Sequence, residues 1–227
     1  MLEQVNKEFI FELLSKQLNN IFNINIDEKE ILKKIFIKGL NRSKFCFSKS
    51  KNKYYKFKGK TLFNTFHSGQ YSIFLYFLSN SLFNHYKNLR DHKIKILADK
   101  VYYLNKMLNG LDLFYEVKMP KVFFLDHPVG TVIGRAKIKN NFSFSARCCV
   151  GNNKGIYPRI GANVLMCNGS SIIGNCKVGN NIIFAANSSI VDINIPNNSI
   201  VYGQYPNNVI KKMQKGKISK IIKGWLI

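Results

Sequence analysis

His127 is the residue of this chain whose type and surroundings best suit proton-transfer chemistry. It follows Asp126, precedes Pro128, and is the only histidine between Leu111 and the C-terminus. An imidazole with its ordinary pKa of about 6.5 can take a proton from a hydroxyl group at neutral pH. The sequence therefore offers two interpretations of His127: a catalytic base, or a structural residue where a helical half of the chain meets a repetitive half.

The chain beyond His127 carries apolar residues at intervals of six. Neither a helix, with 3.6 residues per turn, nor a flat strand, with a period of two, predicts this interval with polar, turn-prone residues between. A solenoid does, if each hexad forms one short face and a turn, so that the apolar residues stack inward from coil to coil. The two series are Val132, Ile138, Phe144 and Val150, and then Ile160, Met166, Ile172, Val178, Phe184 and Ile190.

The two series are separated by ten residues instead of six, from Val150 to Ile160. About four extra residues therefore leave the solenoid as a loop within residues 151–159. Loops that project from a rigid scaffold often carry function.

The first hundred residues have helical spacing instead of repeats. Asp27 is expected to cap a helix, and further helices are expected over about 68–84 and 92–108. The last of these should stop at Asn109 and Gly110, because glycine is the usual residue after a helix C-terminus.

The tail, residues 206–227, is basic and amphipathic. Several isoleucines and Trp225 line one face of a predicted helix, and lysines cover the rest. Such a helix can make peripheral contact with a membrane surface. The open end of a solenoid also needs a cover, and we expect the helix to cap that end.

The net charge of +23 is compatible with nucleic acid, membrane or an anionic ligand. Lysine supplies most of it, whereas arginine, the better reader of bases and phosphates, is rare. The lysine–aromatic segment KSKNKYYKFKGK, residues 49–60, resembles a binder of single-stranded nucleic acid. An exposed loop or hairpin is the commoner structure, so we expect no nucleic-acid partner.

The five cysteines lack the spacing of a metal site and indicate reduced thiols. The first residues lack a basic flank followed by an apolar core, and no apolar run is long enough to span a bilayer. These features predict a cytoplasmic protein.

LDHPVGTVIG, around His127, resembles the LDHATGIVIG-type segment of serine acetyltransferases. This family of hexapeptide-repeat enzymes moves an acetyl group from acetyl-CoA to a hydroxyl. YPRIGANV, residues 157–164, resembles its HPKIG segment, and residues 195–210 resemble its closing coil. Residues 64–80 are similar in layout to its last N-terminal helices, so the resemblance covers about 64–210.

The resemblance implies an α+β fold: an α-helical N-terminal domain, residues 1–110, followed by a left-handed parallel β-helix of hexapeptide repeats, residues 111–205. It also implies a homotrimer, with a hexamer as the larger assembly, and an active site in the groove between neighbouring solenoids. The substrates would be acetyl-CoA and a hydroxyl-bearing small molecule or glycan, and no metal is required.

The same resemblance assigns roles to four residues. His127 would be the general base, and Asp112, fifteen residues earlier, the second catalytic carboxylate. A carboxylate on the imidazole fixes its tautomer and stabilises the imidazolium, as in Ser-His-Asp triads. Asp126 would contact the acceptor, and the backbone N–H of Gly151 would bind the oxyanion.

The resemblance also places acetyl-CoA along the later coils of the solenoid. The cofactor would lie near Ala185, Ala186 and Gly203, with its phosphates near Lys211 and Lys212. The basic tail would then bind the cofactor phosphates as well as cap the solenoid.

The chain departs from the family at Ile156 and Tyr157, where serine acetyltransferases have an arginine and a histidine that hold the amino acid acceptor. Isoleucine cannot pair with a carboxylate, and a tyrosine hydroxyl suits a neutral polyol better. The expected acceptor is therefore a sugar hydroxyl on a surface polysaccharide or its precursor. The alternatives are a serine O-acetyltransferase of cysteine biosynthesis, an acyltransferase that uses acyl-carrier protein, and a non-catalytic β-helix scaffold.

Overall fold

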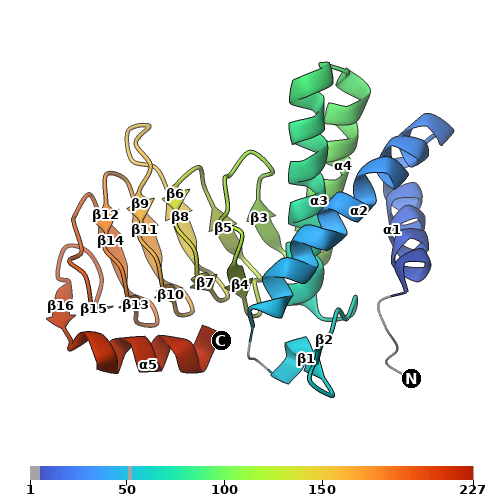
Figure 1. The fold of residues 1–227 in the computed structure, drawn as a ribbon. Helices are drawn as coiled ribbons and strands as arrows, with labels where there is room; N and C mark the ends of the chain where they lie inside the picture. The colour runs from blue at the N-terminus through green and yellow to red at the C-terminus, as the bar shows by residue number, and fades with distance from the viewer. Residues whose placement is uncertain (1–5, 51–52, 227) are drawn as a thin grey trace.

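The chain folds into a helical domain joined to a parallel β-helix (Figure 1). This computed structural model describes residues 6–50 and 53–226. Four helices stand at one end, the strands of the solenoid follow, and the C-terminal helix runs back along one side of the strands toward the helical domain. The helices are α1 (Lys7–Phe22), α2 (Ile26–Ser48), α3 (Ser68–Leu89), α4 (His92–Asn109) and α5 (Lys215–Leu226).

Local capping signals set the helix boundaries. The Asn25 side chain accepts a hydrogen bond from the Glu28 backbone N–H, and the Glu28 carboxylate accepts one from the Asn25 N–H. This capping box satisfies two N–H groups that the start of α2 leaves unpaired. Asp27 lies inside the first turn, so the prediction that it is the N-cap is wrong. α4 ends at Gly110, with φ of 61°, where the sequence predicted a stop.

The lysine–aromatic segment folds as a short hairpin beside the helices, as expected. Tyr55 is buried there, and its ring lies 5.4 Å from the ring of Phe47 and 5.7 Å from that of Phe124. Residues 51–52 of the segment lie outside the described residues. Its elements are a 3-10 helix η1 (Lys53–Tyr55) and the strands β1 (Lys56–Phe57) and β2 (Lys60–Thr61).

One continuous apolar core joins the helical domain to the solenoid. α3 is buried along most of its length, and the rings of Tyr76 and Phe77 both pack edge-to-face on Phe123 of the first coil. The buried Tyr76 hydroxyl donates a hydrogen bond to the Val117 carbonyl. These contacts fix the first coil, and with it the segment that carries His127.

Three sheets form the faces of the β-helix, and each coil passes from face 1 to face 2 to face 3. The strands of these three sheets pair in parallel except β16, which is antiparallel to β15. In the described part of the chain, face 1 consists of β3 (Leu111–Leu113), β5 (Thr131–Ile133), β8 (Cys149–Gly151), β11 (Ser171–Ile173) and β14 (Ser189–Val191). Face 2 consists of β6 (Lys137–Ile138), β9 (Arg159–Ile160) and β12 (Lys177–Val178). Face 3 consists of β4 (Phe123–Leu125), β7 (Phe142–Phe144), β10 (Val164–Met166), β13 (Ile182–Phe184), β15 (Ser199–Tyr202) and β16 (Val209–Lys212).

The apolar residues at intervals of six do stack inward, with one exception. Every residue of the second series is buried. In the first series the prediction is wrong for Val132, which is 44% exposed, whereas its neighbour Ile133 is buried and aligned with Val150. The turn from Ile133 to Ile138 is one residue shorter than a hexad, so the inward register slips by one position.

α5 lies on the outer side of face 3 (Figure 1). Its buried residues Ile218 and Ile222 pack against an apolar row formed by aligned residues of adjacent strands. The prediction that the tail caps the open end of the solenoid is therefore wrong, because this row offers the helix an apolar surface along the face. The side chain of Trp225 lies outside the described ones. The row, here called the apolar row, is Leu165, Ile183 and Ile200.

Candidate active site

His127 lies at the corner where face 3 turns into face 1 in the first coil. The corner spans eight positions, from Leu125 to Ile133, whereas the next corner spans six, from Phe144 to Val150. The two extra residues form a bulge in which His127 adopts a φ of 46° and its side chain is 86% exposed. A positive φ is uncommon for a residue with a Cβ, but regular corners of this solenoid contain one too, at Arg147 and Asn187, so the extra length and the exposed imidazole are what set this corner apart.

Two titratable side chains lie near His127. Its Nε2 lies 3.5 Å from Oδ1 of the exposed Asp126. His67, at the start of α3, lies close enough to interact electrostatically with both residues. Burial lowers the pKa of His67, and its Nδ1 accepts a hydrogen bond from the Gln70 N–H at 3.3 Å. The sequence did not predict this proximity, because sixty residues separate the two histidines.

Asp112 is held by α4. Its Oδ1 accepts a hydrogen bond from the Tyr102 hydroxyl at 2.7 Å, and its Oδ2 lies 2.8 Å from the Lys106 ammonium. Burial alone would raise the pKa of Asp112, but the hydrogen bonds from Lys106 and Tyr102 outweigh it and the pKa lies below its usual value. The structure shows no hydrogen bond between Asp112 and His127, so their pairing would require Asp112 to exchange partners.

Tyr157 lies on a loop at a different edge, where face 1 turns into face 2. Its ring packs on Gly134, where an added Cβ would approach within 2.7 Å of the ring. The Tyr157 hydroxyl accepts a hydrogen bond from the Asn152 side chain at 3.3 Å, and Ile156 beside it is 50% exposed. Within one chain, the structure therefore does not bring Tyr157 together with His127.

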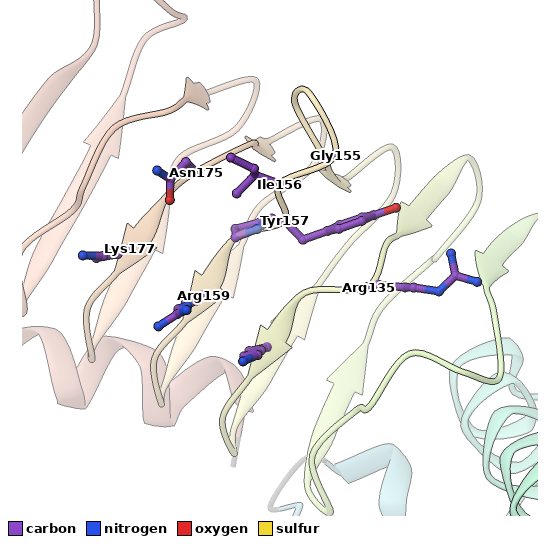
Figure 2. Close-up of a pocket in the computed structure, with 9 residues that line it drawn as sticks. Arg135, Gly155, Ile156, Tyr157, Arg159, Asn175 and Lys177 are labelled. Atoms are coloured by element: carbon purple, nitrogen blue, oxygen red, sulfur yellow. The ribbon is translucent and has the colours of Figure 1, made fainter.

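A hollow of about 450 Å³ opens beside this loop (Figure 2). The side chains of Arg159 and Lys177 point to the same side of the solenoid there, whereas Arg135 points away from them. This cluster was not predicted from the sequence, although each cation of face 2 directly precedes an apolar residue of the repeat. The lining residues are Arg135, Lys137, Gly155, Ile156, Tyr157, Pro158, Arg159, Asn175 and Lys177.

Gly151 ends β8 at the side of face 1 that leads into the same loop. Its carbonyl accepts a hydrogen bond from the Gly174 N–H at 3.0 Å. His127 lies at the opposite side of face 1, so one chain does not bring Gly151 and His127 together.

Three of the residues expected to bind acetyl-CoA share an edge with His127. Ala185 and Ala186 form the corner between face 3 and face 1 in a later coil. Gly203 occupies this edge in the next coil, where its carbonyl accepts a hydrogen bond from the Ser189 N–H at 3.0 Å. The structure thus aligns these small residues with the histidine along one side of the solenoid.

The two lysines expected near the cofactor phosphates lie elsewhere. Lys211 and Lys212 are exposed on β16, opposite Ile200 and Ser199 at the start of β15. Gly203 follows the other end of β15. The width of face 3 therefore separates these lysines from the edge that carries the small residues.

Among residues 6–50 and 53–226, the structure shows no group of three or more His, Cys, Asp or Glu side chains arranged to hold a metal ion. None of the helices described there has the length and apolar character needed to cross a bilayer.

The relatives to which the chain is similar in sequence are serine acetyltransferases. No protein-family model matches the chain. The serine acetyltransferase of Staphylococcus aureus is 25% identical over 164 residues, which cover 65% of this chain and 68% of that protein. The serine acetyltransferase of Staphylococcus epidermidis is 27% identical over the same length and shares.

Solved structures of serine acetyltransferases have the same fold. The Neisseria gonorrhoeae protein superposes with a TM-score of 0.71 at 19% identity, covering 96% of this chain and 84% of its own. The Vibrio cholerae protein gives 0.71 at 18% identity with the same coverage. A serine acetyltransferase in complex with CoA gives 0.66 at 19% identity, covering 92% and 86%. These matches confirm the predicted α-helical N-terminal domain followed by a left-handed parallel β-helix.

Proposed function

We propose that the chain is an acetyl-CoA-dependent O-acetyltransferase of the hexapeptide-repeat superfamily, with His127 as its general base. The observation that carries the assignment is the bulged corner, which presents an exposed imidazole beside the Asp126 carboxylate. The corner also lies within the segment that most resembles serine acetyltransferases.

His127 would act as base and then as acid. Its Nε2 faces Asp126, which leaves Nδ1 to take the proton of the acceptor hydroxyl as that oxygen attacks the thioester carbonyl carbon. The C–S bond then breaks, and the CoA sulfur takes this proton from the imidazolium. The acceptor is left as an O-acetyl ester. The Asp126 carboxylate would stabilise the imidazolium, because an opposite charge nearby favours the charged form.

Acetyl-CoA would lie along the edge that His127 shares with Ala185, Ala186 and Gly203. Three coils separate the histidine from the alanine corner, which is about 15 Å at the usual strand spacing. An extended cofactor arm can follow such an edge, and small side chains allow it to approach the backbone. Solved neighbours in complex with CoA support this co-substrate.

Serine is the acceptor that the comparisons favour, because the relatives are serine acetyltransferases. They give no support to a surface polysaccharide. Ile156 cannot pair with the carboxylate of serine, but Arg159 and Lys177 line the same hollow and can do so. A sugar hydroxyl is the second candidate acceptor, because the neutral hydroxyl of Tyr157 suits a polyol.

A homotrimer would complete the site. His127 and Tyr157 lie on different edges of one solenoid, so they can face one substrate only if the loop of one copy approaches the bulged corner of the next. The resemblance to serine acetyltransferases implies this arrangement, in which Asp126 and Tyr157 contact the acceptor from two sides.

The test measures thiol release from acetyl-CoA with serine, free sugars and nucleotide-linked sugars as acceptors. We expect turnover with serine, a loss of about 10²- to 10⁴-fold in His127→Ala, and no change in His92→Ala, which removes an exposed histidine of α4. Turnover with a sugar and none with serine would show that the acceptor is a sugar. Full activity in His127→Ala would exclude the histidine as base, and no turnover with any acceptor would favour a scaffold.

A further inference from the structure

The outer surface of face 2 carries one cation from each of its strands. Each strand has two residues, of which the second belongs to the apolar repeat and the first is an exposed cation. The three cations are aligned in adjacent strands, about 4.8 Å apart along the solenoid axis. This cation row consists of Lys137, Arg159 and Lys177.

The lysine-rich composition does not explain the row. No strand of face 1 contains a lysine or arginine. The same holds for the five parallel strands of face 3. A random excess of lysine would reach the outward positions of all three faces, whereas in the strands of the β-helix proper the cations gather on face 2.

No acidic side chain among the described residues forms an ion pair with the cation row. Arg135, at the rim of the same hollow, is paired with Glu116 at 3.5 Å. The carboxylate of Asp192 is occupied by hydrogen bonds from the Asn153 side chain and the Asn175 backbone N–H. The described part of the chain therefore leaves the three charges of the row without an acidic partner.

This arrangement disfavours the free protein and favours an anion. Like charges at directly opposite positions of adjacent strands destabilise a sheet. The row also separates two hollows, each about 450 Å³, one beside the Tyr157 loop and one beside Gly161 and Gly179. A negatively charged ligand lying across the row would have room on both sides and would remove the repulsion.

We propose that the cation row binds the phosphate groups of a substrate, an assignment that rests on the proposed acetyltransferase function. Arg159, in the centre, presents a planar set of N–H donors that matches two phosphate oxygens. Lys137 and Lys177 add charge on either side, over a span of about 10 Å. This span exceeds one carboxylate and suits a phosphate or diphosphate. Two substrates can supply it: acetyl-CoA held on the facing edge of a neighbouring copy, or an acceptor that carries phosphate.

The site is tested by calorimetric titration of the full-length protein with pyrophosphate at low ionic strength. We expect saturable binding that weakens about tenfold or more when Lys137→Gln is combined with Lys177→Gln. The matched control combines Lys33→Gln with Lys34→Gln on α2, which removes the same charge from another exposed surface and should leave binding unchanged. Equal weakening in both variants, or no saturable binding to the wild type, would show a diffuse charge effect and overturn the site.

The source of the phosphate is tested by steady-state kinetics of the same two variants. A rise in KM for acetyl-CoA alone assigns the row to the cofactor, and a rise for a phosphorylated acceptor alone assigns it to the acceptor. If pyrophosphate binding is lost while neither KM changes, the row does not serve a substrate. Absence of acetyl transfer in the wild type would defeat the proposed function separately, because the titration does not depend on turnover.

Discussion

Faces 2 and 3 are built by the same repeat, yet they present opposite surfaces. The apolar row of face 3 is buried beneath α5, whereas the cation row of face 2 is exposed. In both rows each coil contributes one outward residue that is aligned with its equivalents above and below. The inward residues hold the solenoid together, so the outward residue is free to determine whether a face is closed by the chain or left open to a ligand.

The corners of the solenoid show the same contrast. Corners of regular length, such as the one at Ala185 and Ala186, continue the edge smoothly. The corner at His127 is longer by two residues, and the bulge exposes the imidazole. In the proposed mechanism, regular coils would supply the surface on which substrates lie, and the irregular corner would supply the base.

The largest effect is expected from Ile183→Lys, which gives face 3 a residue typical of face 2. The ammonium would lie beneath α5 without a partner, and the free energy of unfolding should fall by about 2–4 kcal/mol. Urea denaturation measures the loss, and faster trypsin cleavage within α5 reports detachment of the helix. Val209→Lys, at an exposed position of β16, is the control and should change little. Equal stability of the two variants would show that the apolar row does not hold α5.

A smaller effect on the free energy of unfolding is expected at His67. This residue is partly buried where the helical domain approaches the His127 corner. Burial lowers the pKa of His67 in the folded protein, so the unfolded chain takes up a proton first as the pH falls. Its stabilising effect is full above the unfolded pKa of about 6.5 and is lost below it. Protonation also removes the acceptor of the Gln70 N–H bond, a helix cap with a typical value of about 1 kcal/mol.

His67→Asn keeps a capping acceptor but does not titrate. Its free energy of unfolding should therefore fall less steeply than that of the wild type between about pH 7.5 and 5.5. Denaturant titrations across this range measure the difference. Parallel curves for the two proteins would mean that His67 has the same pKa in the folded and unfolded states.

A third effect on stability is expected at Asp112, an acidic residue at an outward position of face 1. Asp112→Asn should lower the free energy of unfolding by up to about 1 kcal/mol at pH 7, because the ion pair with Lys106 is partly exposed. The pKa of Asp112 is lowered on folding, so its contribution is full above the unfolded pKa of about 3.9 and disappears as the pH falls below it. Urea titrations at neutral and acidic pH check this. A shifted pH profile of kcat would show in addition that Asp112 orients His127.

The sequence predicted the solenoid because most inward positions are apolar and recur at a nearly constant spacing of six. It did not predict the slip at Val132, because Val132 and Ile133 are both apolar and only the length of the following turn selects between them. The sequence also did not predict that α5 packs against the apolar row. Ile183 lies between two inward apolar residues, Ile182 and Phe184, so the strand has no polar–apolar alternation that would mark its outer side.

The site was predictable to the extent that it depends on short segments. His127 and Asp126 stand out in one continuous motif. The hydrogen bonds of Asp112 to Tyr102 and Lys106 depend on how α4 packs against β3, which no local pattern specifies. The cation row is visible in the sequence as a cation before each apolar residue of face 2, but its lack of acidic partners becomes apparent only in three dimensions.

The smallest change in stability is expected from Arg159→Leu, which gives the cation row a residue typical of face 3. Removing the central charge relieves its repulsion with Lys137 and Lys177, so the free energy of unfolding should rise by about 0.2–1 kcal/mol at low ionic strength. Salt screens exposed charges, so the gain should shrink as salt is added. Urea denaturation at low and high salt measures both effects. A loss of stability would contradict the view that the row is held open, because Arg159 would then have a partner within the fold. A gain, together with weaker pyrophosphate binding, would mean that face 2 retains its cations for a ligand and against its own stability, whereas face 3 retains its apolar residues for the fold.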